Sequence, residues 1–188
     1  IEPRAQLRRV CERLLGRAPN FTSLAASAGE TELSGHCVEA ITAVNTLDWA
    51  SLEQAREEFS RILTPGGWVM LGWNQREPSS QDFLRAYENL LIEYGADYQQ
   101  IEAGALPPPG LHEFFGHRHV RHMTFMNPVT LNWEGLKGRL VASGYVPAPG
   151  DPDCPAMLRR LRQLFEQYEQ LDEVTFAYET HVFLGRLI

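Results

Sequence analysis

The chain has 188 residues, a hydrophobic share of 44% and a formal net charge of −7, as expected for one ordinary globular domain with a sizeable core. The acidic balance excludes nucleic acid as the main partner, because binding to phosphates requires a basic face. No apolar run approaches the roughly 20 residues of a membrane span, and three scattered cysteines favour a reducing compartment, the cytoplasm, over a disulfide framework.

The first predicted elements are a helix and two short strands. Apolar residues recur at helical spacing over residues 4–16, and Gly16 stands near the expected end of this helix. Segments 20–26 (NFTSLAA) and 38–45 (VEAITAVN) are typical of short strands. The apolar face of the helix consists of Leu7, Val10, Cys11, Leu14 and Leu15.

A second helix and a buried strand come next. Residues 51–63 are amphipathic, and TPGG (64–67) ends the helix because proline cannot continue it and glycine tolerates the turn. The following run, WVMLGWN, shows no polar alternation, which is typical of a strand covered by helices on both faces of a sheet. The order helix, strand, strand, helix, strand predicts an α/β fold with a parallel sheet.

The second half continues the alternation of helices and strands. We expect helices over 80–94, 132–144 and 156–171, strands over 119–126 and 173–187, and a proline-stiffened loop over 104–116. Strict alternation in the last strand indicates an antiparallel end to the sheet. We predict a single mostly parallel sheet built from strands near 20–26, 38–45, 67–73, 118–126 and 174–185.

Several motifs, in a fixed order, carry a resemblance to a known family. They are the acid of IEP at the start, NTLDW (45–49) after a predicted strand, LTPGG (63–67) before the next strand, and LNWEGLKGRLVASGYVPAPG in the C-terminal half. With these motifs the chain resembles the class I S-adenosylmethionine-dependent methyltransferases, and it is most similar to their small-molecule branch, the ubiquinone-biosynthesis-like and trans-aconitate-like enzymes. The resemblance covers essentially every residue.

The resemblance implies a Rossmann-like α/β domain over 1–188, with a substrate-side insertion over 76–117. It also implies S-adenosylmethionine as cofactor, a small-molecule methyl acceptor and the sheet order 3-2-1-4-5-7-6. In the family, strand one, a glycine-rich turn and most of strand two precede the acid that matches Glu2. We therefore expect an N-terminally truncated domain that lacks strands one and two and is inactive alone. Strand four, 38–45, would then have a bare edge that self-associates or pairs with 20–26.

Four positions match the family's cofactor site. Glu2 matches the acid that accepts hydrogen bonds from the ribose hydroxyls, although a carboxylate favoured by the start of a helix would look the same. Ala28 and Gly29 match the segment that brackets adenine through its backbone. Glu30 either replaces the acid usual at position 29 or is a solvated loop charge. Asn45 matches the polar residue that ends strand four, near the methionine part of the cofactor.

The residues for catalysis and for binding the methyl acceptor are assigned less directly. Asp48 stands where many relatives carry histidine, so it is either a catalytic base or the cap of the helix that begins near Ser51. Aromatic side chains suit a small-molecule pocket but equally suit a hydrophobic core. The candidates for the acceptor pocket are Trp49, Trp73, Phe114, Phe115 and Tyr145.

The histidines do not predict a metal site. His117 and His119 share one face of a strand and His122 lies on the other, but no cysteine or acid pattern completes a ligand set.

The sequence is compatible with two functions. One is an S-adenosylmethionine-dependent methyltransferase acting on a small molecule, and the other is a methyltransferase-like binding or interaction module without catalytic activity.

Overall fold

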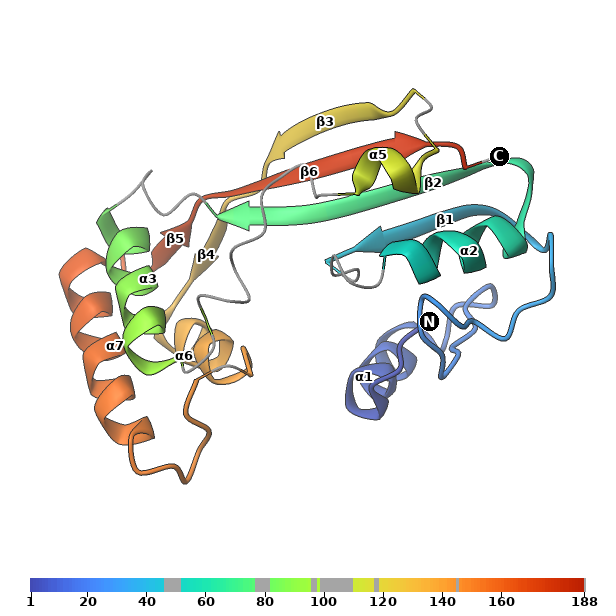
Figure 1. Ribbon diagram of the computed structural model, residues 1–188. Coiled ribbons are helices and arrows are strands. Elements are labelled where there is room, and N and C mark those ends of the chain that lie inside the picture. Colours follow the sequence, from blue (N-terminus) through green and yellow to red (C-terminus); the bar gives the residue numbers. More distant parts are fainter. Residues whose placement is uncertain are drawn as a thin grey trace. The chain divides into compact units, whose positions relative to one another are not determined.

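A computed structural model covers the chain, and its contacts group into two compact units (Figure 1). Unit 1 comprises Ile1–Trp73, Leu106–Met123 and Val182–Ile188, and unit 2 comprises Asn74–Ala105 and Thr124–His181. Each unit has its own hydrophobic core, so each is described by itself. The structure describes residues 1–45, 52–76, 82–95, 98, 110–116, 119–144 and 146–187.

The main sheet has the strand order β1-β2-β6-β3. Strand β1 pairs with β2 in parallel, with Ala40 opposite Trp68 and Val44 opposite Gly72. If these strands are numbered as in the predicted family, the order is 4-5-7-6, which is the second half of the expected sheet. The bounds of the strands are β1 (Val38–Val44), β2 (Leu63–Arg76), β3 (Arg121–Met126) and β6 (Tyr178–Gly185). The α/β class and the predicted position of 38–45 at one end of the sheet are confirmed.

Helix α2 (Leu52–Ile62) connects β1 to β2 and covers one face of the sheet in unit 1. Its apolar stripe forms because Leu52, Ala55, Phe59 and Ile62 recur at helical spacing, and all four are buried. The short helix α5 (Leu111–Phe114) joins the same core, where Phe59 and Phe114 pack edge to face with ring centroids 6.1 Å apart.

Helix α1 (Ala5–Leu15) forms where the sequence predicts it, but none of its residues is buried. The apolar side chains of its predicted face are exposed, with Leu14 at 70%. The periodicity therefore predicted the helix correctly, while the described part of the chain supplies no surface that buries the stripe.

The described part of unit 2 includes the helices α3, α6 and α7 and a two-stranded sheet around one core. Strands β4 (Val129–Leu131) and β5 (Val174–Phe176) pair antiparallel, and Thr130 lies opposite Thr175. Phe176, from β5, lies at the centre of the core and is fully buried. The helices are α3 (Asp82–Tyr94), α6 (Trp133–Val141) and α7 (Cys154–Tyr168), each close to its predicted range.

Two predictions about the strands are wrong. Residues 20–26 form no strand, and among the described residues they do not pair with the edge of β1 that β2 leaves open. The sheet is also not single, since the predicted strand 174–185 is divided at Ala177 into β5 and β6, which lie in different sheets. Among the described residues no helix is long and apolar enough to cross a membrane.

Candidate functional site

The first feature of the candidate site is the carboxyl end of β1, which Asn45 follows directly. The backbone N–H of Asn45 donates to the carbonyl of Gly72 at 2.9 Å, which extends the parallel pairing by one residue. Asn45 has φ 50, a left-handed conformation that asparagine tolerates better than most residues. The chain therefore turns sharply at the sheet edge where open α/β folds bind their ligands.

The turn around Ala28 and Gly29 lies against the first turn of α2. Ser27 and Glu30 close the turn with two reciprocal backbone hydrogen bonds of 3.3 Å. A Cβ on Gly29 would come within 2.8 Å of the side chain of Gln54, so a larger residue here would force the Gln54 side chain to shift. Because α2 begins after the carboxyl end of β1, the contact with Gln54 places the turn at the same edge of the sheet as Asn45.

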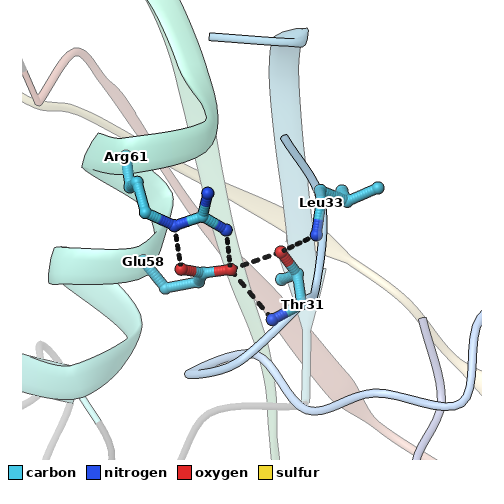
Figure 2. A network of polar contacts seen from close by, with 4 residues as sticks. All are labelled: Thr31, Leu33, Glu58 and Arg61. Carbon is cyan, nitrogen blue, oxygen red and sulfur yellow. Dashed lines mark hydrogen bonds and ion pairs between the residues drawn. The ribbon is translucent and has the colours of Figure 1, made fainter. Parts of the chain in front are cut away.

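A buried carboxylate holds the segment that follows this turn (Figure 2). Glu58 of α2 accepts a hydrogen bond from the backbone N–H of Thr31 at 2.9 Å and another from the Thr31 hydroxyl. Arg61 donates to both oxygens of the same carboxylate at 2.7 Å. The Thr31 hydroxyl oxygen in turn accepts from the backbone N–H of Leu33 at 3.3 Å. The network thus fixes residues 31–33 to α2 and, through them, the turn at 27–30.

The pKa of Glu58 indicates that its carboxylate is ionised and has a structural role. Hydrogen bonds from Arg61, and to a smaller extent from Thr31, lower the pKa of Glu58 from its ordinary 4.5 to about 2, although burial acts in the opposite direction. A carboxyl group with this pKa stays ionised near neutral pH and is a poor proton donor there.

The sequence prediction missed this network, although the sequence contained a signal for it. Glu58 lies three residues after Ala55 and four before Ile62, which places a charge on the apolar stripe of a helix. Charged residues are almost never fully buried unless they are paired. An arginine three residues later on the same helix is the partner such a position requires.

Glu2 lies just before α1 and is half-buried. Its Oε1 accepts hydrogen bonds from the backbone N–H of Arg4 at 2.9 Å and from the Arg4 side chain at 3.1 Å. These bonds from Arg4 lower the pKa of Glu2, the side-chain bond most. The backbone N–H of Glu2 donates to the carbonyl of Leu24 at 3.1 Å, which ties the acid to the segment leading to the Ala28–Gly29 turn. Both side-chain contacts use one oxygen, and Oε2 has no hydrogen-bond partner among the described residues.

The candidates for chemistry and acceptor binding fall into two groups. Asp48, Trp49 and Tyr145 lie outside the described residues. Phe114 and Phe115 are buried in the core of unit 1, and the ring of Phe115 packs directly against Gly185.

Trp73 is half-buried near the end of β2, and its ring meets that of Phe183 at a centroid distance of 5.8 Å. Core packing, the alternative that the sequence left open, accounts for the contacts of Phe114 and Phe115. A part in acceptor binding stays a prediction for all of these residues.

No family model and no curated protein matches the sequence. Several solved structures match the fold. YcgJ from Bacillus subtilis is 12% identical with a TM-score of 0.56, and the match covers 98% of this chain and 79% of that protein. A candidate type II methyltransferase from Anaeromyxobacter dehalogenans is 16% identical with a TM-score of 0.52, covering 92% and 74% of the two chains. A candidate methyltransferase from Bacillus halodurans, BH2331, is 12% identical with a TM-score of 0.52, covering 98% and 80%.

These similarities, together with the strand order 4-5-7-6, establish the class I methyltransferase-type α/β fold. The predicted resemblance is therefore confirmed at the level of the fold.

Proposed function

We propose that the protein transfers a methyl group from S-adenosylmethionine to a small-molecule acceptor in the cytoplasm. The observation that carries this proposal is the arrangement at the carboxyl edge of the sheet. There Asn45 ends β1, and the contact between Gly29 and Gln54 brings the Ala28–Gly29 turn to the same edge. The matching solved structures support the fold on which this arrangement depends.

The residues present fit the cofactor that the fold family implies. Oε2 of Glu2 is available to accept from a ribose hydroxyl while Oε1 is held by Arg4. The turn at Ala28–Gly29 would contribute backbone groups to an adenine site at the sheet edge, while the side-chain direction of Gly29 is filled by Gln54. Asn45 would contribute a side-chain amide to binding the methionine part of the cofactor.

The chain's task in the reaction is binding and alignment. S-adenosylmethionine supplies an electrophilic methyl group on its sulfonium, so the protein has to orient the acceptor and exclude water. Asp48 is our candidate for a base that takes a proton from the acceptor, and Trp49, Trp73, Phe114, Phe115 and Tyr145 are the candidates for the acceptor pocket. The Glu58 network contributes indirectly, because it fixes the residues that follow the adenine-side turn.

Calorimetric titration of the full-length protein with S-adenosylmethionine tests this proposal. Glu2→Ala should weaken binding by about 1–3 kcal/mol, because the ribose hydroxyls lose their acceptor, and Asn45→Ala should weaken it less. The control is Glu57→Ala, which removes an exposed acid of α2 and should leave the affinity unchanged.

Three results would change the proposal. Unchanged binding by Glu2→Ala would remove Glu2 from the site, and failure of the full-length protein to bind would contradict the cofactor. Tight binding without methyl transfer to any tested small-molecule acceptor would favour the non-catalytic binding module.

We also propose that a second copy of this chain pairs with the free edge of β1. Among the strands that the structure describes, β1 ends the sheet, most of its residues are exposed, and Glu39 is its one charged residue. Unpaired, apolar strand edges recruit other chains, and a charged side chain blocks such pairing. Sedimentation over a concentration series should show self-association that Thr42→Lys weakens. The matched control is Thr22→Lys, outside any strand, and an equal effect of both variants would contradict pairing through β1.

A further inference from the structure

A pocket of about 400 Å³ opens on unit 1, lined by Trp68, His119, Arg121, Leu184 and Arg186. Its volume lies within the range of small-molecule sites, roughly 300–1,000 Å³. The lining residues come from β2, from β3 and the residues just before it, and from the end of β6 with the residue after it. Three segments far apart in the sequence therefore build one concave surface.

The pocket lies on the face of the sheet opposite the core. Along β2, Val69 and Leu71 are fully buried under α2, whereas Trp68 is 41% exposed. Side chains of a strand alternate between the two faces, so Trp68 points away from that core. The same alternation separates the buried Phe183 and Leu187 from Leu184 and Arg186.

The pocket is distinct from the proposed cofactor edge. Trp68 lies opposite Ala40, whereas the carboxyl end of β1 lies opposite Gly72. Gly72 lies four positions after Trp68, which corresponds to about 13 Å along the strand. A ligand bound over Trp68 is therefore displaced toward the amino ends of the two parallel strands.

The charge in the pocket is positive and is not neutralised by the described part of the chain. Arg121 and Arg186 form no ion pair with any described acid, although the chain as a whole carries a net charge of −7. The guanidinium of Arg186 instead lies over the indole ring of Trp68, 4.5 Å from its centroid. Two arginines without carboxylate partners at one concave, partly apolar site indicate a place for an external anion.

We propose that this pocket binds a small phosphate monoester. The planar forks of Arg121 and Arg186 match phosphate oxygens with paired hydrogen bonds, and His119 adds a third polar group at the same wall. Trp68 and Leu184 supply the apolar surface for the organic part of the ester. The ligand class is therefore a phosphate attached to a flat or apolar group, and the inference does not depend on the proposed methyl transfer.

The test uses phenyl phosphate and inorganic phosphate as probes in calorimetric titrations of the full-length protein. Phenyl phosphate should bind more tightly than inorganic phosphate, because only the ester has a ring to place against Trp68 and Leu184. Arg121→Gln and Arg186→Gln should each weaken phenyl phosphate binding about tenfold or more, because each removes charge-assisted hydrogen bonds. Trp68→Leu should abolish the advantage of the ester over inorganic phosphate.

Matched control variants distinguish binding of the ester in this pocket from its general attraction to positive charge. Arg9→Gln removes an exposed arginine of α1 in the same unit and should leave the affinity unchanged. Arg186→Lys keeps the charge but loses the planar fork, so it should also weaken binding. Circular dichroism and the thermal midpoint of each variant verify that it is folded, which is expected because both pocket arginines are exposed.

Two outcomes would overturn the proposal. One is phenyl phosphate affinity that is equal in the wild type, Arg121→Gln and Arg186→Gln. The other is an equal loss of affinity in Arg9→Gln, which would show that the ester responds only to the total charge.

Discussion

The two units differ in how fully they bury their apolar residues. In unit 2 the helices α3, α6 and α7 and the small β4–β5 sheet enclose a continuous core in which Phe176 contacts several other rings. Unit 1 has a core under α2 and α5, but it leaves the apolar stripe of α1 and the Trp68 face of its sheet exposed. Periodicity in the sequence predicts the helices of both units equally well. Periodicity does not indicate whether another element buries the apolar face of a helix.

The difference in burial between the units corresponds to where the proposed sites lie. Unit 2 buries its large apolar residues mainly in its own core, so its stability depends on packing among its own side chains. Unit 1 carries the proposed cofactor edge, the free edge of β1 and the phosphate pocket, all on surfaces that its own core leaves open.

The centre of the unit 2 core should tolerate truncation least. Phe176 is fully buried, with ring centroids 5.3 Å from Phe83 and 5.1 Å from Tyr87, and the Arg139 guanidinium lies over its ring. Phe176→Ala should lower the free energy of unfolding of unit 2 by about 3–5 kcal/mol. Hydrogen exchange of the amides of α3 and α7 measures this loss. The control is Leu171→Ala, at a side chain that is 97% exposed, and slow exchange in both variants would contradict a core centred on Phe176.

The strongest polar contribution in unit 1 should come from Glu58. Glu58→Gln should lower the stability of unit 1 by about 1–3 kcal/mol, because the bonds from Arg61 and Thr31 lose a charged acceptor. The pKa of Glu58 falls on folding from 4.5 to about 2, so its contribution is complete above about pH 4.5 and is lost as the pH falls toward 2.

The measurement for this prediction is urea unfolding of the wild type and the variant between pH 2 and pH 7. The two should differ most at neutral pH and converge in acid. A difference that stays constant down to pH 2 would show that the charge of Glu58 is not what stabilises the fold.

A smaller effect is expected at the start of α6 in unit 2. The side chain of Asn132 accepts a hydrogen bond from the backbone N–H of Gly135 at 2.9 Å and so caps the helix. Asn132→Ala should cost about 1 kcal/mol, whereas Asn132→Ser should restore most of it. The midpoint of urea unfolding is the readout, and equal stability of the alanine and serine variants would refute the capping role.

The smallest effect should come from α1, and it tests the comparison between the units most directly. Leu14→Ala should change the stability by no more than about 0.5 kcal/mol, because the side chain is already 70% exposed. The matched variant Leu161→Ala, at a fully buried position of α7, should cost about 2–5 kcal/mol. A large loss in Leu14→Ala would mean that a surface covers the stripe of α1 in solution.

The sequence was sufficient to predict the elements with strong local signals. TPGG followed by WVMLGWN marked the end of α2, and the motif order implied the 4-5-7-6 order of the sheet. The strand itself was predicted only in part, because β2 already begins at Leu63 and because Trp68 is 41% exposed, so β2 is not covered on both faces. The sequence was misleading where structure depends on a neighbour. Residues 20–26 have strand-like composition but no strand beside them, and β4 is too short, with three residues, to produce a recognisable alternation.

The sequence predicted where the candidate site lies better than it predicted the contacts within the site. Asn45 ends β1 as predicted, because a polar residue after an apolar strand marks its carboxyl end. The arrangement around Ala28 and Gly29 depends on contacts with Gln54 and on the Glu58 network, which join residues more than 20 positions apart. No local pattern reports such contacts, although a charge on the apolar stripe of α2 was an indication of one. The functional roles of Glu2, Ala28, Gly29 and Asn45 stay predictions.

The bond between Thr31 and Glu58 also sets an order of events in time. It joins positions 27 residues apart, so it closes a loop and carries an entropic cost that the local bonds within α2 do not carry. The turn at 27–30 should therefore be among the last parts of unit 1 to become ordered and among the first to open. The turn would then be released by loss of the bonds to one carboxylate rather than by unfolding of the sheet.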